Sequence, residues 1–179
     1  MRWQGVLAFA AVALATAGAA ADTAAPYAGW QGRDIKALSA RQVDDLAAGR
    51  GMGLALAAEL NGYPGPRHVL DLSDDLELTA GQRAAFEALF EAMQAEAQRI
   101  GTAILAEEAD LDAAFRGGRL EEAGLDQHLA RLGSLQGELR RAHLRAHLTA
   151  RALLSPIQVA RYNTLRGYGG EHGGHGHTP

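Results

Sequence analysis

Two histidines four residues apart, His143 and His147, have the type and spacing needed to bind a metal ion. In an α-helix, residues i and i+4 lie on one face, a single turn apart. Two imidazoles placed in this way provide half of a tetrahedral zinc site, and imidazole also binds copper and nickel. A further ligand has to come from elsewhere, and His68, which follows a Pro-Gly-Pro turn, is the strongest candidate. The alternative is that the pair flanks a core or a subunit seam.

A second group of histidines at the C-terminus could bind the same ions. His172, His175 and His177 lie in a Gly-rich stretch, so we expect residues 169–179 to form a disordered tail with a weak, exchangeable site. The alternative is a solvated tail without a ligand. The chain contains no cysteine, which excludes thiolate ligands, disulfides and thiol catalysis.

A stripe of arginines could bind a protein partner. Arg131, Arg141 and Arg145 are predicted to lie on one side of a helix, beside its leucines. Such a surface could attract unfolded, acidic client chains, or it could be a solvated face whose charges pair with glutamates. No nucleophile and base stand in a catalytic arrangement, so we expect no enzyme and no required cofactor. The formal net charge of −4 argues against nucleic-acid binding.

The elements that must position these residues are predicted to be helices. Apolar residues recur at helical spacing over residues 79–116 and 120–153, and Gly117-Gly118 separates the two segments. This pattern predicts a long antiparallel hairpin, with a first helix about 55 Å long. We expect an all-α fold in which shorter helices at 39–60, 66–76 and 155–166 flank the hairpin. Because a bare hairpin cannot cover both of its apolar stripes, we expect these short helices to pack on it, together with a second subunit in a homodimer.

The N-terminal part is predicted to be an export signal and an arm. A positive start, an apolar run at residues 6–15 and Ala19-Ala20-Ala21 before Asp22 are typical of a cleaved secretory signal peptide, here residues 1–21. We therefore expect a periplasmic protein with no integral membrane segment after cleavage. Residues 22–65 are predicted to hold an extended arm and the first helix, whose pattern is interrupted by three glycines.

A short motif, Leu-Ser/Thr-x-x-Gln, begins at residues 38, 78 and 154. A Ser or Thr at the N-cap accepts a hydrogen bond from the first helical turn, and Gln three residues later reaches back to the N-cap amide, so each copy predicts a helix start. With Thr79 and Gln82 in one copy and Ser155 and Gln158 in another, residues 66–168 resemble the LTxxQ-motif family of periplasmic stress and heavy-metal resistance proteins (Spy-, CpxP- and ZraP-like).

The resemblance implies a helical hairpin, often a dimer, that acts in the periplasm without catalysis. Some members are ATP-independent chaperones for unfolded or envelope proteins, and others bind zinc, copper, nickel or cobalt. This chain differs from Spy-like members in being acidic, and residues 22–65 have no counterpart in them. We expect a stress protein of the chaperone or heavy-metal resistance type that acts by reversible binding. A histidine-based metal buffer or sensor, and a non-catalytic envelope adaptor that binds through residues 22–65, are the alternatives.

Overall fold

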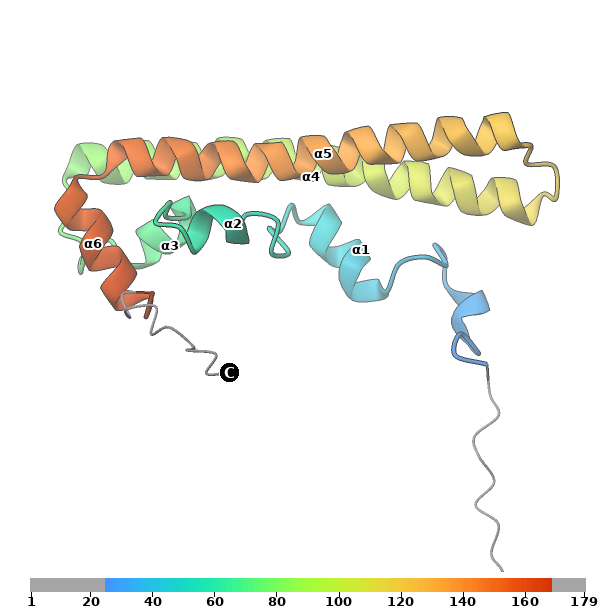
Figure 1. Ribbon diagram of the computed structural model, residues 1–179, viewed down its shortest axis with the longest axis horizontal. Coiled ribbons are helices and arrows are strands. Elements are labelled where there is room, and N and C mark those ends of the chain that lie inside the picture. Colours follow the sequence, from blue (N-terminus) through green and yellow to red (C-terminus); the bar gives the residue numbers. More distant parts are fainter. Residues whose placement is uncertain (1–24, 169–179) are drawn as a thin grey trace, which may run out of the picture. The chain divides into compact units, whose positions relative to one another are not determined.

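The computed structural model describes residues 25–168, which form helices and turns without a strand (Figure 1). The predicted all-α class is therefore confirmed. The chain divides into two units, residues 1–31 and 32–179. In the described part of the first unit, the rings of Tyr27 and Trp30 lie 5.2 Å apart, and a 3-10 helix, η1 (Trp30–Gly32), begins. Residues 25–37 contain turns and η1, so the prediction of an extended arm is wrong over this stretch.

Two long helices dominate the second unit. α4 (Ala80–Arg116) and α5 (Glu122–Leu153) run antiparallel and side by side, and the chain reverses between them where Gly118 adopts a φ of +64° (Figure 1). Both helices lie within two residues of the predicted bounds. A further helix, α6 (Pro156–Leu165), turns away from the end of α5. No helix among residues 25–168 combines the length and apolarity needed to cross a membrane.

The Leu-Ser/Thr-x-x-Gln motifs form capping boxes at the starts of α1 (Ala40–Ala47), α4 and α6, as predicted. Two of them also bind each other across the fold. The side-chain amide of Gln82 donates to Gln158 Oε1 at 2.9 Å, and that of Gln158 donates back to Gln82 Oε1 at 3.1 Å. The same amides donate to the backbone carbonyls of Leu153 (2.9 Å) and Leu76 (3.2 Å). The motif pair therefore fastens the start of α4 to the α5–α6 corner.

The segment before the hairpin forms three short helices, α1 (Ala40–Ala47), α2 (Leu56–Glu59) and α3 (Pro66–Asp71). The prediction of one helix over 39–60 is wrong, because Gly49 takes a φ of +65° and ends α1. Glycine is also needed for packing here. A Cβ on Gly101 of α4 would lie 2.1 Å from the carbonyl oxygen of Leu46, so α1 ends directly against the α4 backbone.

Two apolar clusters hold these elements on the hairpin. The first joins α1 to the middle of α4 and α5 through Leu46, Ala97, Ile100, Ile104, Leu132, Leu135, Leu139 and Ala142. The second joins α3, α6 and the open end of the hairpin through Val69, Leu76, Phe86, Ala150, Leu154, Val159 and Tyr162. Near the hairpin turn the predicted apolar stripes are not covered, since Phe115 is 61% and Leu129 51% exposed.

Candidate metal-binding cavity

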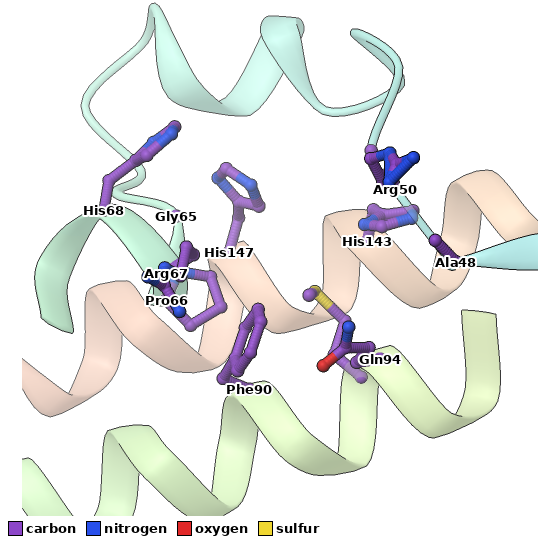
Figure 2. A pocket seen from close by; sticks show the side chains of 13 residues that line it. Ala48, Arg50, Gly65, Pro66, Arg67, His68, Phe90, Gln94, His143 and His147 are labelled. Atoms are coloured by element: carbon purple, nitrogen blue, oxygen red, sulfur yellow. The ribbon is translucent and has the colours of Figure 1, made fainter. Parts of the chain in front are cut away.

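A cavity of about 510 Å³ lies between residues 48–51, the start of α3 and the two long helices α4 and α5. In Figure 2, the rings of His143 and His147 rise from α5 toward the segment that carries Arg50 and Gly65. Phe90 and Gln94 enter from α4. The remaining lining comes from Ala48, Gly49, Gly51, Pro66, Arg67, His68 and Met93.

His147 has a fixed orientation in this cavity. Its Nδ1 lies 2.7 Å from the backbone carbonyl oxygen of Tyr63. Because a carbonyl can only accept, Nδ1 carries the hydrogen and donates it, which leaves Nε2 of the neutral ring as the nitrogen with a lone pair. A Cβ on Gly65 would lie 3.3 Å from this Nε2, so the glycine keeps space open beside it. Histidines that bind metals through Nε2 typically donate their Nδ1–H to a carbonyl in this way.

His143 is buried without full hydrogen bonding. The residue is only 4% exposed, and the Nε2 atom of its ring has no hydrogen-bond partner among the described residues. Burial, and then the electrostatic interaction with the His147 ring, lower the pKa of His143 below its ordinary value, so the ring of His143 is neutral at pH 7. A buried polar atom without a partner costs about 1–3 kcal/mol of folding free energy. A ligand that binds to this nitrogen would recover that cost.

Glu59 of α2 anchors the wall of the cavity next to His147. Its carboxylate accepts hydrogen bonds from the Tyr162 hydroxyl (2.5 Å), the Gly65 amide (3.0 Å) and His68 Nδ1 (3.3 Å). His147 Nδ1 lies 3.6 Å from Glu59 Oε2. Burial would raise the pKa of Glu59, but the hydrogen bonds from His68 and Tyr162 and the electrostatic effect of both imidazoles lower it to about 2. The carboxylate is therefore ionised and ties α2, α3, α5 and α6 together.

The same contact raises the pKa of the Tyr162 hydroxyl above its ordinary value, through burial first and then through its hydrogen bond to the charged Glu59. Tyr162 is completely buried in the second apolar cluster. It therefore stays protonated and acts as a permanent donor to Glu59.

The predicted metal ligands are brought together only in part. His68, His143 and His147 line one cavity, but the Nδ1 of His68 is used by Glu59. No group of three or more His, Asp or Glu side chains in residues 25–168 is placed to hold a metal ion. The cavity thus offers a two-histidine arrangement. His172, His175 and His177 lie outside the described residues, as does the predicted signal peptide.

The predicted arginine stripe is divided. Arg131 Nε lies 3.0 Å from Glu107 Oε2, and the other oxygen of that carboxylate accepts from His128 Nδ1 at 2.6 Å. Arg141 and Arg145 are exposed and form no ion pair with any residue in the described range. Of the three arginines in the predicted stripe, Arg141 and Arg145 keep the unpaired charge that the client-surface prediction requires, and Arg131 does not.

Sequence reasoning missed the residues that organise the cavity, namely Glu59, Tyr63 and Gly65. Glu59 stands in an ordinary helical pattern, and nothing in the local sequence marks it as buried. The Gln82–Gln158 pair did have a signal, because the same motif starts the helices on both sides of the hairpin. Comparison with family models, curated proteins and solved structures finds no match for this chain.

Proposed function

We propose that this chain is an exported, non-catalytic protein of the stress or heavy-metal resistance type that binds a divalent metal ion reversibly. The observation that carries this proposal is the cavity of His143 and His147. One imidazole is oriented by a backbone carbonyl with its Nε2 next to Gly65, and the other has a buried nitrogen without a partner. Burial of an unpaired imidazole opposes stability, which is typical of residues kept for a ligand.

Zinc, copper and nickel suit this donor set. Neutral imidazole is the form that binds metal, and the lowered pKa of His143 keeps it in that form. Met93 lines the same cavity and offers a soft thioether donor, which favours copper over harder cations. With two imidazoles as the main ligands, water completes the coordination. Fewer protein ligands mean weaker binding than in a closed structural site, in keeping with reversible uptake.

A zinc titration by calorimetry tests this function. The full chain is compared with the double variant His143→Ala/His147→Ala and with a chain that ends at Gly170, which lacks the three tail histidines. We expect a site that survives the truncation and disappears in the double variant. Gly65→Ala should weaken the same site, because its methyl group would lie 3.1–3.3 Å from the ring of His147. Uptake that disappears only with the tail would refute the cavity as the metal site.

Chaperone activity is the second candidate, and exposed apolar side chains favour it. Leu148, Ile157 and Leu165 on α5 and α6 are 57%, 80% and 45% exposed, and Arg145 nearby in sequence has an unpaired charge. Such side chains could hold an unfolded client without ATP. We expect Ile157→Ser to reduce suppression of client aggregation while zinc uptake is unchanged. Equal suppression of aggregation by the wild-type protein and by Ile157→Ser would contradict this role. Light scattering on the same samples measures the molar mass and so tests the predicted homodimer.

A further inference from the structure

A second cavity, of about 320 Å³, lies between α1, the loop at 52–54 and the middle of the hairpin. Its walls are mainly apolar and include Leu46, Met52, Ile104 and Leu139. Leu46, Ile104 and Leu139 also belong to the first apolar cluster, so the core of the fold holds the walls in place. Cavities of a few hundred Å³ with apolar walls and a few polar groups are typical small-ligand sites.

One charged group lines this cavity, the carboxyl of Glu108 on α4. Its neighbours on the helix are paired: Glu107 with Arg131 and His128, and Asp112 with Lys36 (3.1 Å). Glu108 has neither an ion pair nor a hydrogen bond with the residues of the described range. Burial raises the pKa of its carboxyl, which is the expected response of an acid without a counter-charge.

We infer that this cavity binds a small apolar amine, with its hydrocarbon part against Leu46, Ile104 and Leu139 and its ammonium group on Glu108. The cation would supply the counter-charge that the protein does not provide. The side-chain amides of Gln42 and Gln136, which also line the cavity, offer oxygen acceptors for the remaining ammonium hydrogens. An acid would be repelled by Glu108, and a neutral apolar molecule would leave the carboxylate unpaired.

The methionines allow the two cavities to be observed separately. Of the three methionines in the chain, Met52 lines this cavity and Met93 lines the histidine cavity. Full-length protein with ¹³C-labelled methionine methyl groups is titrated with octylammonium, octanol and octanoate, and Met52→Leu and Met93→Leu assign the signals. We expect octylammonium to shift the Met52 signal saturably and to leave the Met93 signal in place, whereas zinc affects Met93.

Glu108→Gln tests the role of the charge, and Asp110→Asn is its matched control, because Asp110 is exposed on the same helix and does not line the cavity. Loss of a charge-assisted contact should weaken octylammonium binding about tenfold or more in Glu108→Gln and little in the control. The inference is overturned if Met52 does not respond, if octanol binds as tightly as octylammonium, or if Glu108→Gln binds like the control. If a lysine peptide binds more tightly than octylammonium, the ligand is a polypeptide and the inference of a small amine is wrong.

Discussion

Replacing Gly101 by alanine tests the close contact between α1 and α4 that fixes one end of the histidine cavity. A Cβ at this position would lie 2.1 Å from the carbonyl oxygen and 2.8 Å from the carbonyl carbon of Leu46. Both are backbone atoms, so no side-chain rotation relieves the overlap. The end of α1 has to move by about an ångström, because Cβ atoms essentially never lie closer than 3.0 Å to another heavy atom. That movement separates Leu46 from the first apolar cluster.

The cost can be estimated against a control on the same hairpin. Gly133 is a helical glycine in α5, and a Cβ there would meet nothing within 4 Å. Both Gly→Ala changes gain about 1 kcal/mol of helix propensity, which cancels in the comparison. Overpacking a tight contact typically costs about 1–3 kcal/mol. We therefore expect Gly101→Ala to have a free energy of unfolding about 1–3 kcal/mol lower than Gly133→Ala.

Urea unfolding followed by circular dichroism measures this difference in the full-length protein. Hydrogen exchange at residues 40–48 adds a local measurement, because displacement of α1 should increase exchange there in Gly101→Ala only. Equal stability of the two variants, with unchanged exchange, would show that α1 does not pack backbone-to-backbone on α4.

Further predictions concern the buried polar groups and the capping residues of the fold. The pKa of Glu59 is about 2, against an ordinary 4.5, so its ionised carboxylate contributes about 3 kcal/mol to the free energy of unfolding above pH 4.5. This contribution is lost as the pH falls toward 2. Urea unfolding measured across this pH range should show the loss, and Glu59→Gln should lack it. In a double-mutant cycle, Gln82→Ala and Gln158→Ala should show a coupling of about 0.5–3 kcal/mol in urea unfolding, and additive effects would contradict the reciprocal amide pair. Gln42→Ala, which breaks only a local capping box, should cost about 1 kcal/mol and show no coupling to Gln158. His143→Leu should raise the melting temperature while abolishing zinc binding, because about 1–3 kcal/mol of unpaired burial is removed; a lower melting temperature would refute this.

The hairpin and its caps were predictable because they depend on local patterns. The apolar spacing of α4 and α5, the Gly117-Gly118 turn and the three capping boxes all act within a few residues of one another. The prediction of one helix over residues 39–60 was wrong for a reason that is also local. Gly49 takes a left-handed conformation and ends α1. Helical periodicity continues through such a position in the sequence, although the backbone does not.

The cavity was predictable only through its histidines, namely the pair His143 and His147 and the third candidate His68. His143 and His147 share a helix, so their spacing places them on one face. Tyr63, Gly65 and Glu59 lie against His147 from more than 80 residues earlier in the chain, through contacts that no local pattern encodes. The same holds for Glu108: its position on α4 follows from the sequence, whereas its missing counter-charge depends on where Lys36 and Arg131 bind in the folded chain.

The most direct test of the proposed metal site is the ¹⁵N NMR spectrum of the histidine side chains of the full-length protein, recorded with and without zinc. We predict that Nε2 of His147 and one ring nitrogen of His143 move to the shifts of metal-bound imidazole, while Nδ1 of His147 remains protonated and bonded to the Tyr63 carbonyl. If zinc moves only the signals of His172, His175 and His177, the cavity does not bind metal, and the proposed metal site is wrong.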